Sequence, residues 1–180
     1  MSLADAFQSV AKGLGAVALA VPLIVGCAGE GGFRPMYATP TDGGPSLDQK
    51  LAAIEFAAIP GRVGQRIRNE LNFQATGGGD PAPPRYKVEV VLKERVVTTL
   101  VDRDGQSRGQ VYTVDADFRL ISTADKAVVL TGASYGRASF ERFTSIYANV
   151  RAREDAENRV ARTIAGDIRS RLAAFLAARA

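Results

Sequence analysis

Apolar and polar residues alternate in three stretches of the second half of the chain. The pattern runs over residues 86–100, where valine and leucine alternate with lysine, glutamate and arginine, and it recurs over residues 112–120 and 127–137. A period of two is typical of strands that bury one face and expose the other. The pair Asp104-Gly105 separates the first two stretches and predicts a hairpin between them.

Two further stretches have a period near four, which is typical of amphipathic helices. Residues 62–72 carry Val63 and Ile67 on one stripe, and residues 147–178 carry a longer stripe. The members of that longer stripe are Val160, Ile164, Ile168, Leu172, Phe175 and Leu176. Residues 51–59 read as a first, short strand. The order β-α-β-β-β-α predicts an α/β fold of the α+β sandwich type, a four-stranded mixed sheet with two helices packed on one face.

The N-terminal region reads as a targeting segment. Residues 14–27 form an uncharged run that is too short to cross a bilayer comfortably, and the run ends in Ile24-Val25-Gly26-Cys27, which resembles the bacterial lipobox. In that pathway Cys27 is cut to become the first residue and receives diacylglyceryl and N-acyl groups such as palmitate, which hold a protein on a membrane. A buried free cysteine is the alternative.

These features predict three segments. Residues 1–26 form a lipoprotein signal peptide, residues 27–48 form a lipidated flexible tether rich in glycine and proline, and residues 49–180 form the folded domain.

Composition narrows the range of functions. The chain has 180 residues with 23 Lys+Arg against 19 Asp+Glu, no histidine and one cysteine. Without histidine there is no Ser-His-Asp triad, no Cys-His dyad and no histidine-rich zinc site. We therefore expect a protein that is not an enzyme and holds no metal and no cofactor other than the acyl groups on Cys27. Most of the cations are arginine, which grips phosphate or carboxylate through a planar fork, so an anionic partner is expected.

Two patterns that could carry chemistry have simpler explanations. Gly132-Ala133-Ser134-Tyr135-Gly136 matches the Gly-x-Ser-x-Gly pattern of serine hydrolases, but it lies inside a predicted strand and has no histidine base. A strand with close-packing glycines is the favoured interpretation, and a lipid-acting hydrolase that uses Ser134 is the rival. Asp115 and Asp117 share one strand face as a metal pair would, but alternation places them on the solvated side beside Arg119.

The arginines fall into two groups. Along the last predicted helix, Asp155 precedes Arg159 by four residues and Asp167 precedes Arg171 by four, so these arginines are expected to be balanced on a solvated surface rather than to bind nucleic acid. The predicted topology brings a second group to one end of the sheet, where it could bind phosphate. Its members are Arg103, Arg108, Arg137, Arg142, Arg151 and Arg153. A solvated tip without a ligand explains the same residues, and the sequence leaves both readings open.

Several motifs together resemble one family. A lipobox cysteine precedes Gly32-Phe33-Arg34-Pro35-Met36-Tyr37, then a stretch from Ile59 to Leu71 that contains Arg-Val-Gly-Gln-x-Arg-Asn-x-Leu, then Ala152-Arg153-Glu154-Asp155-Ala156. This set resembles the LptE-type lipopolysaccharide-assembly lipoproteins over nearly the whole chain after the cysteine. A Gly-rich linker between Cys27 and Gly32 departs from the family pattern.

The resemblance implies a lipid-anchored protein at the periplasmic face of the outer membrane. Members of the family plug the β-barrel translocon LptD, help that barrel fold and bind lipopolysaccharide. The family's lipopolysaccharide-binding positions match Arg103 on the hairpin and Arg153 near the start of the last helix, and Arg108 and Arg151 are expected to contribute. Neither catalysis nor nucleic-acid binding is expected. The rival reading is a generic periplasmic scaffold lipoprotein whose arginines bind carboxylates of another envelope protein.

Overall fold

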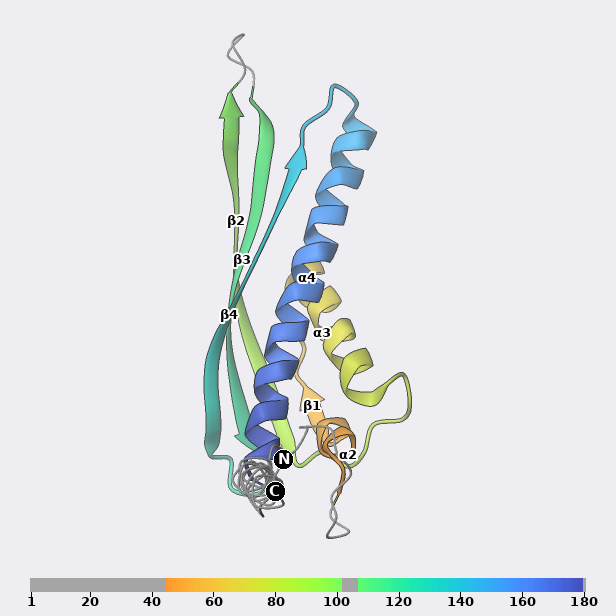
Figure 1. The fold of residues 1–180 in the computed structure, drawn as a ribbon, viewed down its shortest axis with the longest axis vertical. Helices are drawn as coiled ribbons and strands as arrows, with labels where there is room; N and C mark the ends of the chain where they lie inside the picture. The colour runs from red at the N-terminus through yellow and green to blue at the C-terminus, as the bar shows by residue number, and fades with distance from the viewer. Residues whose placement is uncertain (1–44, 102–106, 180) are drawn as a thin grey trace, which may run out of the picture. The chain divides into compact units, whose positions relative to one another are not determined.

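A computed structural model describes residues 45–101 and 107–179. Figure 1 shows a twisted sheet with the helices gathered on one side of it. The elements in chain order are α2 (Leu47–Ala52), β1 (Ile54–Phe56), α3 (Gly61–Thr76), β2 (Tyr86–Val101), β3 (Ser107–Ser122), β4 (Val128–Glu141) and α4 (Ile146–Ala177). The predicted fold, a four-stranded mixed sheet with helices on one face, is confirmed.

The sheet has the order β1-β2-β3-β4. The short strand β1 runs parallel to β2, as a crossover through α3 requires, and pairs Ile54 with Tyr86. The long strands β2, β3 and β4 run antiparallel to one another, and Val90 of β2 lies opposite Phe118 of β3. The antiparallel pairing of β2 and β3 confirms the predicted hairpin, whose tip at residues 102–106 lies outside the described residues.

The core lies between the sheet and the helices α3 and α4. Both predicted apolar stripes are buried: Ile67 of α3 and Ile164 of α4 are each 0% exposed. The sheet contributes its alternate residues, among which Tyr112 and Phe118 are the largest fully buried side chains. The opposite face of the sheet carries no helix among the described residues, so Asp117 there lies in solvent, paired with Lys93 at 4.0 Å.

Two glycines of β4 let other groups approach the strand closely. A Cβ atom at Gly136 would lie 2.8 Å from Val160 Cγ1 on α4, and one at Gly132 would lie 2.6 Å from the Phe118 ring. Real Cβ atoms do not approach that closely, so a larger residue would push α4 or the ring away. These contacts agree with the interpretation of the Gly-x-Ser-x-Gly stretch as a strand with close-packing glycines.

The first elements differ from the prediction. The expected strand over residues 51–59 is limited to Ile54–Phe56, and the six-residue helix α2 precedes it. A capping box starts this helix: Gln49 N donates to Ser46 Oγ at 3.3 Å and Ser46 N donates to Gln49 Oε1 at 3.0 Å. Leu47 and Leu51 then lie four residues apart and are both buried, so packing holds the helix in place.

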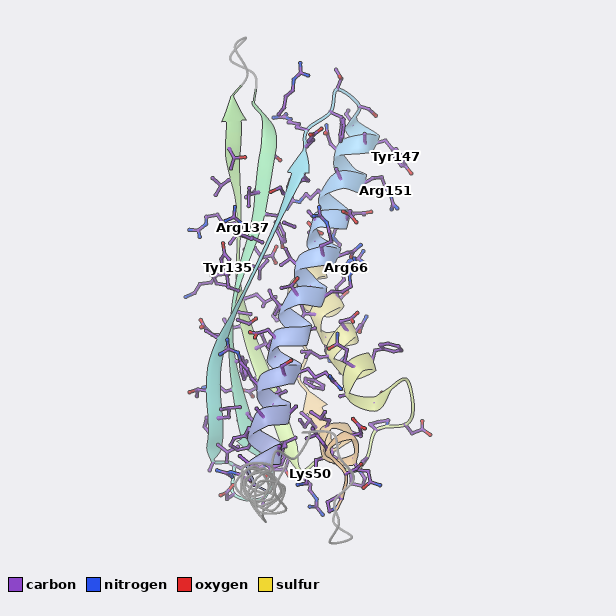
Figure 2. All side chains as sticks on the ribbon, viewed as in Figure 1. Lys50, Arg66, Tyr135, Arg137, Tyr147 and Arg151 are labelled. Atoms are coloured by element: carbon purple, nitrogen blue, oxygen red, sulfur yellow. The ribbon has the colours of Figure 1, made fainter. Side chains whose placement is uncertain are left out.

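The helix α2 packs against the far end of the chain. Lys50 Nζ of α2 lies 3.5 Å from the carbonyl oxygen of Leu176, in the last turn of α4, and donates a hydrogen bond to it. Figure 2 shows Lys50 at this end of the domain, while Tyr147 and Arg151 lie at the opposite end, where α4 begins. Within residues 45–101 and 107–179, the structure has no helix both long and apolar enough to pass through a bilayer.

Candidate functional site

Three arginines come together where β3 begins, β4 ends and α4 begins: Arg108 lies in β3, Arg142 directly follows β4 and Arg153 lies in α4. Arg108 and Arg142 line a hollow of about 840 Å³. Arg142 and Arg153 line an adjoining hollow of about 430 Å³. We call Arg108, Arg142 and Arg153 the basic pole. The predicted convergence of arginines at this end of the sheet therefore holds for these three residues.

The connection between β4 and α4 is held in a fixed conformation. Arg142 N donates to the Arg108 carbonyl at 2.7 Å, which extends the pairing of β3 with β4 by one residue. The Asn149 side chain accepts from Phe143 N at 2.6 Å and donates to the Phe143 carbonyl at 2.8 Å. Ser145 caps the start of α4 through the Ala148 N–H at 3.4 Å. The backbone that carries Arg142 is thereby fixed relative to the first turns of α4.

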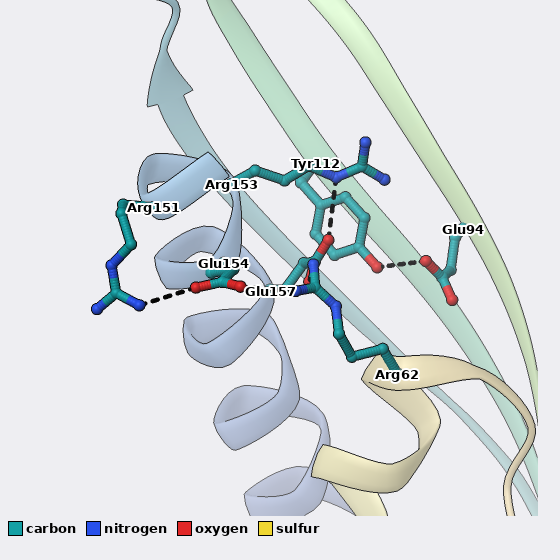
Figure 3. Close-up of polar contacts among 7 residues, drawn as sticks. All are labelled: Arg62, Glu94, Tyr112, Arg151, Arg153, Glu154 and Glu157. Atoms are coloured by element: carbon teal, nitrogen blue, oxygen red, sulfur yellow. Dashed lines mark hydrogen bonds and ion pairs between the residues drawn. The ribbon is translucent and has the colours of Figure 1, made fainter. Parts of the chain in front are cut away.

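Arg153 is positioned by a buried carboxylate. Its Nε donates to Glu157 Oε1 at 3.0 Å, and the Glu157 side chain is 3% exposed whereas the Arg153 side chain is 53% exposed. Arg62 Nη2, at the start of α3, donates to the other oxygen of Glu157 (Figure 3). Two guanidinium groups thus compensate one buried negative charge, as burial of a charge requires. The ion pair directs Arg153 toward the sheet and the second hollow.

The Arg151 side chain points away from the basic pole. Its Nη1 pairs with Glu154 at 2.9 Å, and Glu154 also accepts from Arg62 Nη1 at 2.9 Å. Figure 3 shows Arg151 and Arg153 leaving α4 on different sides. Arg151 therefore lines neither hollow of the basic pole.

A buried tyrosine lies beneath the basic pole. The Tyr112 side chain on β3 is fully buried, and its hydroxyl donates to Glu94 Oε2 on β2 at 2.6 Å. Burial raises the pKa of Tyr112 well above its ordinary value, and the hydrogen bond and negative charge of Glu94 raise it further. Tyr112 is therefore a neutral donor that ties β2 to the core beside Glu157.

An exposed apolar cluster adjoins the basic pole. Phe143 lies in the connection to α4, and Ile146, Tyr147 and Val150 lie in the first turns of α4, where their exposed fractions are 82%, 75% and 50%. We call Phe143, Ile146, Tyr147 and Val150 the apolar cap. Exposed large apolar residues grouped in this way are typical of surfaces that bind other molecules. Phe143 lines the first hollow with Arg142, and Val150 lines the second.

The remaining predicted site residues have separate locations. Cys27 and Arg103 lie outside the described residues. Arg137 lies opposite Thr113 on the uncovered face of the sheet, and Figure 2 places it beside Tyr135, away from the start of α4. Arg137 therefore does not join the basic pole.

The other candidate chemistries have structural explanations. Ser134 is 5% exposed inside β4, and its hydroxyl has no hydrogen-bond partner among the described residues. The two predicted helix pairs are present: Arg159 Nε lies 2.8 Å from Asp155 Oδ2, and Arg171 Nε lies 3.1 Å from Asp167 Oδ2. These side chains are balanced on the surface of α4, as expected from their spacing.

Sequence reasoning missed Glu157 and the apolar cap. A signal for Glu157 was available, because it lies three residues before Val160 and therefore on the apolar stripe of α4, where a charge needs a partner. A signal for the cap was available too, because Ile146, Tyr147 and Val150 precede the part of the helix whose stripe is buried.

Comparison with known proteins identifies the family. The sequence profile described as "LptE: Lipopolysaccharide-assembly" matches residues 50–172. The chain belongs to the LptE family. No curated protein matches the sequence. The LptE profile spans every described element except the first three residues of α2 and the last five residues of α4. The basic pole, the apolar cap and the buried Glu157 are thus features of a lipopolysaccharide-assembly protein.

Two solved structures resemble this LptE-family chain. A Caulobacter crescentus CB15 protein described as a lipoprotein has 24% identity and a TM-score of 0.62, and the match covers 74% of this chain and 97% of that one. A minor lipoprotein from Acinetobacter baumannii has 9% identity and a TM-score of 0.51, with coverages of 68% and 92%. At these identities the likeness establishes a shared fold.

Proposed function

We propose that this LptE-family chain is an outer-membrane lipoprotein that plugs an LptD-type β-barrel, assists assembly of that barrel and binds lipopolysaccharide at the basic pole. The family profile supports a part in lipopolysaccharide assembly. The mechanism is binding without turnover. The lumen of a large barrel is polar, which suits the charged side chains on the uncovered face of the sheet, such as Lys93 and Asp117.

The observation that carries the lipopolysaccharide proposal is the meeting of arginines and apolar side chains at one end of the domain. Lipid A combines phosphate groups with acyl chains. Arginine forks suit phosphate, and Arg142 makes no side-chain hydrogen bond or ion pair within the described part of the chain, so its fork is available. Phe143 and Val150 of the apolar cap line the same hollows as the arginines, so both parts of an amphiphile have a counterpart there.

The anchor of this proposal is Cys27. Two or three acyl chains, each contributing about 0.8 kcal/mol per buried methylene, anchor a protein stably on a membrane. Pro45, the first described residue, follows Cys27 by 18 positions that include many glycines and prolines, a composition suited to a tether at the periplasmic face of the outer membrane.

The assembly part of the proposal is tested by purification. The full chain is expressed in a Gram-negative host with an affinity tag after Ala180 and is extracted in mild detergent. We expect mass spectrometry to find a stoichiometric large β-barrel protein and an acylated Cys27. Acylated protein that purifies without a barrel would contradict the plug role and favour a scaffold role instead.

The lipopolysaccharide part is tested by charge reversal. Arg142→Glu is expected to weaken binding of purified lipopolysaccharide by about tenfold, because one phosphate contact is replaced by repulsion. Arg171→Glu, at the other end of α4, is the matched control and is expected to bind normally. To test Arg153, we prefer Arg153→Gln to Arg153→Glu. A glutamate at this position would place a second negative charge beside the buried Glu157 and would destabilise the domain. Equal binding by Arg142→Glu and Arg171→Glu would contradict the proposed site.

A further inference from the structure

The upper half of β2 forms an open edge of the sheet. The only strand that pairs with β2 on this side, within the described residues, is β1, and that pairing ends at Phe56 opposite Val88. Ala57 N donates to the Val88 carbonyl, so the backbone groups of Val88 point toward β1. Backbone direction alternates along a strand, and the register with β3 runs without a shift to Thr98. The N–H and C=O groups of Leu92, Glu94, Val96 and Thr98 therefore point toward the open edge.

The side chains along this edge are exposed on both faces of the sheet. Every residue from Lys93 to Thr99 is exposed, and Val96 and Val97, which point to opposite faces, are 40% and 43% exposed. On the neighbouring strand the residues from Val111 to Val114 are all buried. Figure 1 shows β1 beside only the lower part of β2. A long edge strand that carries valines and no proline is a ready template for another strand.

We propose that this open edge, from Leu92 to Thr98, receives an extended segment of the partner barrel protein by β-strand addition. This inference rests on the proposed function in one respect, namely that the partner is the barrel. A domain enclosed by a partner loses the water that solvates its edge, so the free N–H and C=O groups need new partners. Main-chain pairing would then provide affinity, and the alternating side chains would provide register.

Charge favours such a partner over a second copy of this chain. Lys93 and Arg95 both lie on the uncovered face of the sheet, and Arg95 makes no ion pair within the described residues. An antiparallel second copy centred on Glu94 would place Lys93 of each chain opposite Arg95 of the other, which is unfavourable. A segment with acidic side chains at these two positions would instead pair with them. The edge is thereby protected from self-association and open to an acidic strand.

The first test replaces one edge-facing N–H. Val96→Pro removes a donor that points to the open edge and leaves the bonds to β3 in place, whereas Val96→Thr keeps the N–H and a similar shape. The full-length tagged variants are purified from detergent extracts, with circular dichroism and thermal unfolding as checks of the fold. We expect Val96→Pro to retain at least tenfold less barrel protein than wild type and Val96→Thr to retain the wild-type amount. Retention of the barrel by a folded Val96→Pro variant would overturn the inference.

The second test needs no variant. Residue-resolved hydrogen exchange compares the full chain alone with the chain in its barrel complex. The amides of Glu94, Val96 and Thr98 are expected to exchange at least tenfold more slowly in the complex, while those of Arg95 and Val97, which already face β3, are expected to change little. Uniform change, or no change, would overturn the inference even if Val96→Pro fails to fold.

The remaining outcomes separate this inference from the proposed function. If the amides of Glu94, Val96 and Thr98 slow with protein concentration in the chain alone, a second copy occupies the edge and the inference is wrong. If wild type purifies without any barrel protein, the proposed function fails and the inference fails with it. If wild type and a folded Val96→Pro variant hold the barrel equally, the proposed function stands and only the β2 edge assignment falls.

Discussion

Arg62, at the start of α3, donates a hydrogen bond to the buried carboxylate of Glu157 on α4, 95 residues later in the chain. Arg153 binds the other oxygen of Glu157 at 3.0 Å. The contact joins the two helices that cover the sheet and fixes an arginine of the basic pole at the same time. The stability of the domain and the position of that arginine are therefore coupled through one side chain.

Removing the charge of Glu157 is expected to destabilise the domain. Glu157→Gln keeps the shape but weakens two charge-assisted hydrogen bonds, and we expect the free energy of unfolding in urea to fall by about 1–3 kcal/mol. The loss stays below that of a fully buried ion pair, because Arg62 and Arg153 are 49% and 53% exposed and solvent screens them.

The matched control for this substitution is Asp167→Asn. Asp167 pairs with Arg171 at the same i,i+4 spacing on α4, but the Asp167 side chain is 38% exposed whereas that of Glu157 is 3% exposed. We expect Asp167→Asn to lower the free energy of unfolding by less than about 1 kcal/mol. Equal losses at Glu157 and Asp167 would show that burial of Glu157 adds nothing.

Replacing glycine with alanine is expected to destabilise the protein at position 136 and to stabilise it at position 166. Gly136→Ala places a methyl group 2.8 Å from Val160 and 3.0 Å from Ile164, so α4 must move away and the free energy of unfolding should fall by about 1–3 kcal/mol. Gly166 lies within α4, and a Cβ atom there would have no neighbour within 4 Å. Gly166→Ala should therefore raise the free energy of unfolding by about 0.5–1 kcal/mol. Thermal unfolding of both variants is the measurement, and a stabilised Gly136→Ala would contradict the packing described for β4.

Because Tyr112 is buried, we expect the free energy of unfolding to fall in alkaline solution. Its pKa is raised in the folded state by burial and by Glu94, so the folded protein holds this proton more tightly than the unfolded chain does. The stabilisation is fully present below the unfolded value of about 10 and declines as the pH rises above it. Urea unfolding at pH 8 to 11 should show this decline in wild type and in Tyr135→Phe, where an exposed tyrosine is changed.

Tyr112→Phe should flatten that alkaline decline. It should also cost about 1 kcal/mol at pH 7, because the hydrogen bond to Glu94 is lost. A decline of the same steepness in Tyr112→Phe and wild type would show that other groups cause it.

Ser134→Ala is expected to leave both stability and function intact. The hydroxyl is buried without a hydrogen-bond partner in the described structure, so its removal should change the free energy of unfolding by less than about 1 kcal/mol or raise it. Growth of a strain that depends on this chain, and recovery of the barrel complex, are the measurements. A folded variant that loses function would revive the hydrolase reading.

The sequence predicts most of this fold because one face of each long element is buried. Alternation over β2, β3 and β4 and the stripes of α3 and α4 follow directly from that burial. The helix α2 was missed although Ser46 and Gln49 form a recognisable capping box, because six residues among glycines and prolines give too short a pattern. The length of β1 was overestimated because Ile59 is buried without belonging to the sheet.

The site could be predicted only in its location. Topology alone brings Arg108, Arg142 and Arg153 to one end of the sheet, since strand direction fixes where each strand begins and ends. The direction of each side chain depends on contacts between distant segments. Arg153 turns toward the sheet because of Glu157, and Arg151 turns away because of Glu154, and neighbouring positions on one helix do not reveal that difference.

The length of α4 sets how far the domain can reach. Its 32 residues span about 48 Å at 1.5 Å per residue, and Lys50 of α2, the first described element, donates a hydrogen bond to the last turn of this helix. A lipid bilayer with its headgroups is about 40–45 Å thick. Under the proposed function, α4 would therefore set the distance between the lipid anchor and the basic pole. If the anchor lies near the last turn of α4, that distance is about the thickness of a bilayer, and each helical turn removed would shorten it by about 5.4 Å.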